Sequence, residues 1–134
     1  MLATSTEVEV PHVVPARARV VVTTTAGHTA VAVTGDLDLS VTSSLHERLE
    51  AELSRRPAAL VLDLAGVTFC SAGALAVLLD VVTTAHARGV PCAIVATDRA
   101  VLRPIRLLRL DRVLPLHADR AEAEDWLSLV RRLR

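Results

Sequence analysis

The spacing of hydrophobic and polar positions changes several times along the chain, and each change predicts a boundary between secondary-structure elements. Residues 19–25 and 29–34 are rich in Val and Thr, which are residue types that favour strands. Only Ala26-Gly27-His28 separates the two runs, and so short a connection is typical of antiparallel neighbours. The pattern therefore predicts a β-hairpin at this point of the chain.

An apolar stripe with a period near four follows the hairpin and predicts an amphipathic helix. Ser40 precedes the stripe and is a suitable N-cap, and the helix has to end before Pro57. The stripe consists of Val41, Leu45, Leu49 and Leu53.

Two short apolar runs, residues 59–64 and 92–96, are typical of strands that are buried on both faces. The segment between them has apolar residues at helical spacing, so we expect a second helix over residues 72–88. Gly89 follows this helix as a C-terminal signal. The apolar face consists of Leu75, Leu78, Leu79 and Val82.

Two further helices and one short strand are expected in the last third of the chain. Asp98 can cap a third helix, although Pro104 inside it should kink it or delay its start. Residues 113–116 read as a strand, and the final helix begins near Asp119. The inward positions are Val101, Ile105 and Leu108 in the third helix, and Trp126, Leu129, Val130 and Leu133 in the last one.

The resulting order, ββαβαβαβα, predicts the α/β fold class. We expect one domain with a mixed sheet of about five strands, mostly parallel after the hairpin and covered by about four helices. Residues 1–16 show no sustained period, so we expect them to form a flexible N-terminal leader ahead of a domain at residues 17–134.

The composition suits one compact domain and narrows the classes of function. The 134 residues are 51% hydrophobic, which is enough for a core without metals or disulfides. The 15 basic and 15 acidic side chains balance, so no overall charge draws the molecule to nucleic acid or an anionic membrane. Phe69 and Trp126 are the only aromatic residues, too few for a platform that stacks nucleic-acid bases. All the basic residues are Arg, which suggests a GC-rich bacterial genome.

The sequence favours a cytoplasmic protein without membrane insertion. No run of about 18 apolar residues could span a bilayer, and the first residues lack the pattern of a signal peptide. Cys70 and Cys92 form neither a CxxC pair nor a disulfide framework, so we expect buried thiols in a reducing compartment.

No catalytic motif is evident, so we expect neither enzymatic activity nor a cofactor. A P-loop and a Gly-x-Ser-x-Gly motif are both absent from the sequence. The five histidines are scattered without the spacing of metal ligands, so no metal site is expected. The remaining enzymatic alternative uses Cys70 or Ser71 as a nucleophile, which a residue distant in sequence would have to activate.

Residues 67–75 join a buried strand to the second helix, a place where open α/β sheets bind ligands. Ser71 can cap the helix, whose first N–H groups favour an anion. Ala72, Gly73 and Ala74 would let the backbone of another protein approach closely. A helix cap with small residues that pack on the sheet explains the same sequence equally well.

Two charged segments are candidates for a partner-binding role. Asp36 and Asp38 lie in the turn before the first helix, where they can also simply complement the helix dipole. A stripe of arginines along the third helix could contact acidic partners, but most stripes of this kind are solvated, and no DNA-binding signature accompanies it. It consists of Arg99, Arg103, Arg106 and Arg109.

Three segments resemble the STAS domain of anti-sigma factor antagonists over residues 17–133. Residues 33–38, Val-Thr-Gly-Asp-Leu-Asp, are similar to the family's Gly-Glu/Asp-Leu-Asp turn. Residues 60–69 are similar to its central strand and following loop, and residues 100–114 to its third helix and last strand. The resemblance implies an anti-sigma factor antagonist that binds an anti-sigma factor of the serine-kinase type. The docking residues it implies are Asp36, Asp38, Ser71, Ala72, Gly73 and Ala74.

The family's loop usually reads Asp-Ser-Ser/Ala-Gly-Leu, and its first Ser is phosphorylated by the partner kinase. An ungapped match places Ser71 at the Asp and Ala72 at the phosphoacceptor, so the switch is missing. A match slipped by one residue makes Ser71 the phosphorylation candidate, with one extra residue before Leu75. Both readings stay open, as does a sensory or scaffold STAS module that binds a small molecule or a nucleotide. A weak homodimer is also compatible with the sequence.

Overall fold

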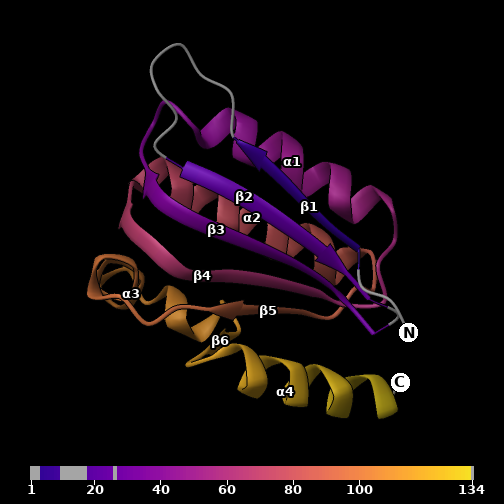
Figure 1. The fold of residues 1–134 in the computed structure, drawn as a ribbon. Helices are drawn as coiled ribbons and strands as arrows, with labels where there is room; N and C mark the ends of the chain where they lie inside the picture. Colours follow the sequence, from indigo (N-terminus) through magenta and orange to yellow (C-terminus); the bar gives the residue numbers. More distant parts are fainter. Residues whose placement is uncertain (1–3, 10–17, 26, 134) are drawn as a thin grey trace.

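A computed structural model describes residues 4–9, 18–25 and 27–133 and contains one mixed sheet. Its six strands lie side by side in chain order. They are β1 (Thr4–Glu9), β2 (Ala18–Thr24), β3 (Thr29–Leu37), β4 (Leu60–Cys70), β5 (Cys92–Val95) and β6 (Leu116–His117). The helices are α1 (Thr42–Ser54), α2 (Ala72–Ala87), α3 (Arg99–Leu107) and α4 (Arg120–Arg132), with a short 3₁₀ turn at Leu110–Arg112. Figure 1 shows the arrangement.

The predicted hairpin is confirmed. β2 and β3 pair antiparallel, with Val20 opposite Val33 and Val22 opposite Val31. The turn is closed by the backbone N–H of Thr25, which donates to the carbonyl of His28 at 2.9 Å. Alternate valines of β2 point into the core, as the period of two requires.

Residues 4–9 of the expected N-terminal leader form a strand, which is a sixth strand beside the about five that were predicted. β1 pairs antiparallel with β2, from Thr4 opposite Thr24 to Glu9 opposite Arg19. Its sequence, TSTEVE, offers little apolar periodicity, since backbone hydrogen bonds to a neighbouring strand do not require hydrophobic side chains. The other residues of the predicted leader lie outside the described ranges.

The rest of the sheet is parallel, as predicted. β4 lies between β3 and β5, and β6 follows β5 at the edge. Parallel neighbours need a crossover, which α1 provides between β3 and β4 and α2 provides between β4 and β5. The carboxyl ends of β3 and β4 therefore come together at one end of the molecule, which lies on the left in Figure 1.

The helices cover both faces of the sheet and form two apolar clusters. The larger cluster holds buried residues of α1, α2 and α3 against the sheet, including Leu49, Leu78 and Ile105. The smaller cluster lies on the other face, where Ala123 and Leu127 of α4 pack on β3, β4 and β5. Figure 1 shows α4 separated by the sheet from α1 and α2.

Several predicted boundaries differ from the structure, among them the ends of β3 and β4, which continue to Leu37 and Cys70 beyond the expected residues 34 and 64. The first helix is not capped by Ser40, because its hydroxyl and N–H both donate to Oδ1 of Asp38 and Val41 occupies the N-cap position. The start of α3 is not delayed by Pro104, because Oδ1 of Asp98 accepts from Ala100 N–H and fixes the start at Arg99. The strand expected at residues 113–116 begins only at Leu116 and ends at His117, because Val113 closes the preceding 3₁₀ turn through its N–H bond to the carbonyl of Leu110.

The inner face predicted for α4 was wrong. Its buried residues are Ala123 and Leu127, whereas of the predicted residues only Val130 is half-buried, and Trp126, Leu129 and Leu133 are exposed. The small side chain of Ala123 faces the sheet because α4 packs closely on a surface that consists of alanines and valines.

Candidate functional site

The turns that follow β3 and β4 meet at the carboxyl end of the two strands. Asp36 lies opposite Phe69 in the sheet, and Leu37 lies opposite Cys70. The N–H of Ser71 donates to the carbonyl of Leu37 at 2.9 Å and ties the start of α2 to the end of β3. The two segments that sequence analysis selected separately are therefore one site.

Each acidic residue of the site accepts a hydrogen bond from a nearby hydroxyl group. Thr68 Oγ1 donates to Asp36 Oδ1 at 2.7 Å and links β4 to β3. Asp38 accepts from the backbone N–H of Ser40 at 2.9 Å and shapes the turn before α1. Both carboxylates thus have structural roles, and both remain partly accessible to a partner.

Ser71 is the N-cap of α2, as predicted. Its Oγ accepts from the N–H of Ala74 at 3.1 Å, which satisfies one of the donors that the first helical turn leaves free. The helix then runs without interruption from Ala72 to Ala87, and Leu75 lies buried beneath the first turn.

The first turn of α2 has one exposed, one partly exposed and one buried small residue. Ala72 is exposed. Gly73 approaches Leu39 so closely that a Cβ there would lie 3.1 Å from Cδ2 of Leu39. Ala74 is 0% exposed and belongs to the core, so its expected role in partner contact is wrong. The N-cap position explains this, because it turns the third residue of the helix toward the sheet.

Replacing the cap has a measurable cost. Ser71→Ala should lower the free energy of unfolding by about 1 kcal/mol, because the Ala74 N–H loses its acceptor. Ser71→Asp keeps an acceptor at that point and should stay within about 0.5 kcal/mol of the parent chain. Urea denaturation measures both variants, and equal midpoints for Ser71→Ala and the parent would rule out the capping role.

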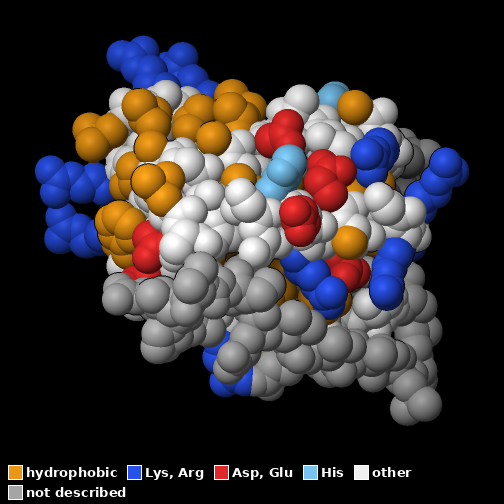
Figure 2. All heavy atoms as spheres, turned by 90° about the horizontal axis from the view of Figure 1, so that it is seen from above, with side chains coloured by type: hydrophobic (Ala, Val, Ile, Leu, Met, Phe, Trp, Pro, Cys, Tyr) orange, Lys and Arg blue, Asp and Glu red, His pale blue; other side chains and the backbone are white. Residues whose placement is uncertain are grey.

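Large apolar side chains are exposed around the same turns, a feature that sequence analysis missed. Leu39 is 75% exposed and Phe69 is 50% exposed, and at the end of α3 Leu107 and Leu108 are exposed, although Leu108 was expected to face inward. Figure 2 shows hydrophobic side chains gathered at this end of the molecule beside arginines. The sequence contains a signal for the exposure of Leu39, because this leucine of the Gly-Asp-Leu-Asp-Leu segment lies outside any apolar period.

We name the residues at the carboxyl ends of β3 and β4 the strand-end surface. It combines two carboxylates, exposed apolar side chains and small residues at a helix N-terminus. Its members are Asp36, Asp38, Leu39, Phe69, Ser71, Ala72 and Gly73.

Cys70 lies beside this surface but is not an activated nucleophile. Its side chain is buried, and desolvation raises the pKa of the thiol to about 11. Burial raises the pKa of the Cys92 thiol further, to about 12. A thiol of raised pKa stays protonated near neutral pH, which is opposite to what thiol catalysis requires.

Alkylation measures the state of Cys70 directly. At pH 7.5 we expect labelling by iodoacetamide at least about 10-fold slower than for a free cysteine, because little thiolate is present. The rate should rise about 10-fold per pH unit until the pH approaches the raised pKa. Mass spectrometry measures the labelling. Rapid labelling of Cys70 at pH 7.5 would contradict the burial of the thiol and support the enzymatic alternative.

The structure brings together three potential metal ligands that sequence spacing did not reveal. Nε2 of His46 lies 2.7 Å from Asp80 Oδ2 and 3.9 Å from Glu50 Oε1, which joins α1 to α2. Among the residues that the structure describes, this is the only group of its kind. Exposed carboxylates beside a histidine are explained by the ion pairs themselves, so we assign no metal to them.

The fold and the strand-end surface define a single α/β domain with a mixed sheet, with α1, α2 and α3 packed on one face and α4 on the other. A family model described as “Mlab, STAS domain” matches residues 20–116 of the chain. The chain therefore belongs to the STAS domain family, as its sequence motifs predicted.

Solved structures agree with this assignment. An anti-sigma factor antagonist from Mycobacterium paratuberculosis is 26% identical, with a TM-score of 0.74 over 83% of this chain and 94% of its own. A variant of RsbS from Moorella thermoacetica shares the fold at 20% identity, with a TM-score of 0.71 over 83% of this chain and 96% of its own. No curated protein matches the chain. In the part of the chain that the structure describes, no helix is both long and apolar enough to cross a membrane.

Proposed function

We propose that this protein is a cytoplasmic anti-sigma factor antagonist-like module that sequesters a kinase-type anti-sigma factor through its strand-end surface. The observation that carries the proposal is the exposure of Leu39 and Phe69 beside the small first turn of α2. Similarity to an anti-sigma factor antagonist supports the choice of partner.

The chemistry of the strand-end surface suits a protein partner. A partner that covers Leu39 and Phe69 removes apolar area from water, which is the main source of affinity in such contacts. Ala72 and Gly73 allow a close backbone approach at the centre of the surface. Asp36 and Asp38 provide acidic acceptors at its edge, where they favour basic groups and improve specificity.

We further propose that this contact is not controlled by phosphorylation of the loop before α2. The unbroken start of α2 at Ala72 and the burial of Leu75 support the ungapped match to the family's loop. In that match Ser71 stands at the family's Asp and acts as the cap, while Ala72 stands at the phosphoacceptor and has no hydroxyl group. A slipped match would require an additional residue in the first turn of the helix.

A binding and phosphorylation assay tests both statements. The purified chain is titrated with the kinase-type anti-sigma factors of its own genome, ATP is added afterwards, and the products are analysed by mass spectrometry. We expect binding with a Kd of about 1 μM or tighter and no phosphate on the parent chain. Ala72→Ser restores the hydroxyl and should become phosphorylated, after which binding is lost because charge enters the contact.

Other outcomes of the same assay are equally informative. Phosphate on Ser71 of the parent chain would establish the slipped match and a switched antagonist. Failure to bind any of these anti-sigma factors would contradict the proposed partner and favour the sensory STAS module. A thermal-shift screen with nucleotides and small anions would then test that second function.

A further inference from the structure

Leu129 and Leu133 of α4 are exposed on the side turned away from the sheet, and Trp126 lies at the edge of the sheet, with its ring 5.2 Å from that of His117. Trp126, Leu129 and Leu133 recur at a spacing of three and four residues and form one stripe along the helix, which we name the α4 stripe. Leu129 is 55% exposed, Leu133 is 80% exposed and Trp126 is 37% exposed. The helix thus buries a smaller apolar face and leaves a larger one open.

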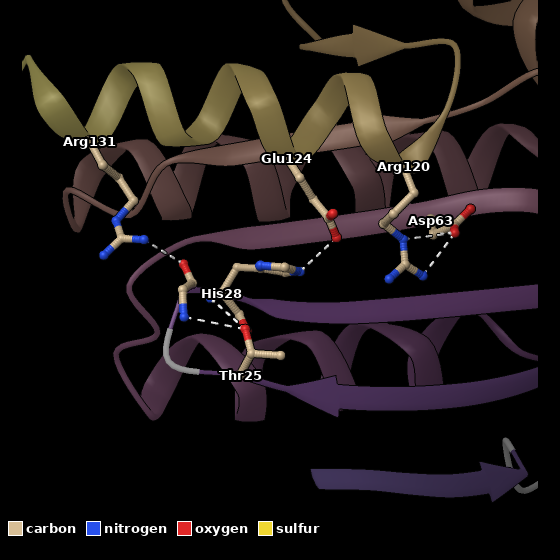
Figure 3. Close-up of polar contacts among 7 residues, drawn as sticks. Thr25, His28, Asp63, Arg120, Glu124 and Arg131 are labelled. Atoms are coloured by element: carbon tan, nitrogen blue, oxygen red, sulfur yellow. Dashed lines mark hydrogen bonds and ion pairs between the residues drawn. The ribbon is translucent and has the colours of Figure 1, made fainter. Parts of the chain in front are cut away.

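Polar contacts on the inner side of α4 fix this orientation. Nε and Nη2 of Arg120 donate to Asp63 Oδ2 at 3.1 and 2.9 Å. Glu124 Oε2 lies 3.1 Å from His28 Nε2. Figure 3 shows that these side chains extend from α4 toward the strands.

A third contact acts at the other end of the helix. Arg131 Nη1 donates to the carbonyl of Gly27 at 2.9 Å, in the turn of the hairpin. The three contacts lie along one side of α4, from its first turn to its last. The α4 stripe cannot turn inward without breaking them, so its exposure belongs to the fold.

An apolar cavity of about 510 Å³ continues the stripe toward the edge of the sheet. Trp126 and Val130 form its wall on the side of α4, and the start of β5 and the end of α2 form the rest. The remaining lining residues include Val82, Val90, Pro91, Val113 and Pro115. Together the stripe and the cavity form one apolar surface, larger than a scatter of single exposed side chains.

The charges beside the stripe identify what fits it. Asp125 and Arg132 are exposed and lie seven residues apart, so they project from the same flank of the helix about 10 Å from each other. When two copies of α4 pack antiparallel about a two-fold axis near Leu129, each Asp125 lies opposite the other copy's Arg132. The surface is therefore complementary in charge to itself, as an isologous interface requires.

We propose that the α4 stripe is a dimer interface and that its occupant is α4 of a second copy of this chain. Leu129 meets its counterpart at the axis, and Trp126 packs against Leu133 of the second copy beside the cavity. The cavity lies near the amino ends of the parallel strands, away from the strand-end surface. A dimer of this kind presents two strand-end surfaces at once, and the proposal does not depend on what binds to them.

Sedimentation velocity and fluorescence test the dimer on the full chain. Trp126 is the only tryptophan, so its emission reports the interface alone. From about 1 μM to about 1 mM we expect the mass to rise from monomer to dimer and the emission to shift to shorter wavelength. Leu129→Glu should abolish both changes, whereas Leu107→Glu, at a leucine of α3 that is 73% exposed, should leave them intact.

A charge exchange tests the predicted pairing. Asp125→Arg and Arg132→Asp should each weaken the dimer at least 5-fold, because each variant places like charges opposite one another. In a mixture of the two variants, every pair again joins opposite charges, so mixing should restore dimer formation. Circular dichroism verifies that each variant is folded.

Three results would overturn the proposal. The chain could remain monomeric at every concentration, or its dimer could persist unchanged in Leu129→Glu. Alternatively, the hydrophobic probe bis-ANS could shift the Trp126 emission of a chain that stays monomeric at about 1 mM, which would assign the surface to a small apolar ligand.

Discussion

Ala72→Glu is expected to weaken binding of the anti-sigma factor about 30-fold or more while leaving the fold intact. Ala72 is exposed at the first turn of α2, so a longer charged side chain costs little in the free protein. In the complex the same side chain must be desolvated where partner and helix approach most closely. A loss of affinity of this size is typical of the centre of an interface. Isothermal titration calorimetry measures the change in Kd.

The matched control for this variant is Ala87→Glu. Ala87 is also exposed, and it lies at the last position of the same helix, away from the strand-end surface. We expect its affinity to remain within about 2-fold of the parent chain. Equal losses in Ala72→Glu and Ala87→Glu, or no loss in either, would place the partner on another surface.

Ala74→Glu, only two residues further along, should prevent stable folding. Ala74 is 0% exposed and packs in the larger apolar cluster, which offers neither space nor a partner for a carboxylate. Burying an unpaired polar group in a filled core should cost more than about 4 kcal/mol, comparable to the total stability of many domains. Loss of far-UV circular dichroism or a collapsed urea midpoint would record the effect.

Ala72→Glu and Ala74→Glu introduce the same side chain in the same helical turn. They differ only in whether that side chain points to solvent or into the core. A folded Ala74→Glu variant with a urea midpoint near that of Ala72→Glu would contradict the placement of Ala74 in the core. It would also reopen the expectation, made from the run of small residues alone, that Ala74 contacts the partner.

The sequence predicted most of the fold because the strongest signals arise from burial. The valines of the hairpin and the apolar run before Gly66 have to be buried, and period and length distinguish the strands from the helices. Asp98 was recognised as a cap, and the last helix was placed to begin near Asp119, because side-chain capping depends on neighbours in sequence.

The features that the sequence missed depend on contacts between distant segments. β1 is held by pairing with β2, which leaves little trace in its own apolar pattern. The face of α4 follows from ion pairs to Asp63 and His28 and from the small residues under the helix. Apolar periodicity alone selected the opposite side, because it cannot distinguish a core from an interface.

The same limit applies to the site. The two loops were selected from their residue types, but their meeting at the ends of β3 and β4 required the sheet register. The contact between Leu39 and Gly73 joins residues 34 positions apart and could not be read from either loop. The exposed fraction of the side chain distinguishes Ala72 from Ala74, whereas the sequence analysis gave both residues the same role.

Hydrogen–deuterium exchange of this chain, alone and with a kinase-type anti-sigma factor of its own genome, tests the central claim most directly. We expect the partner to slow exchange at residues 35–40 and 68–76, the segments that form the strand-end surface. Exchange in α4 should remain unchanged at concentrations below those of the proposed dimer. Protection confined to α4, or protection of neither segment in a saturated complex, would show that the partner does not bind the strand-end surface.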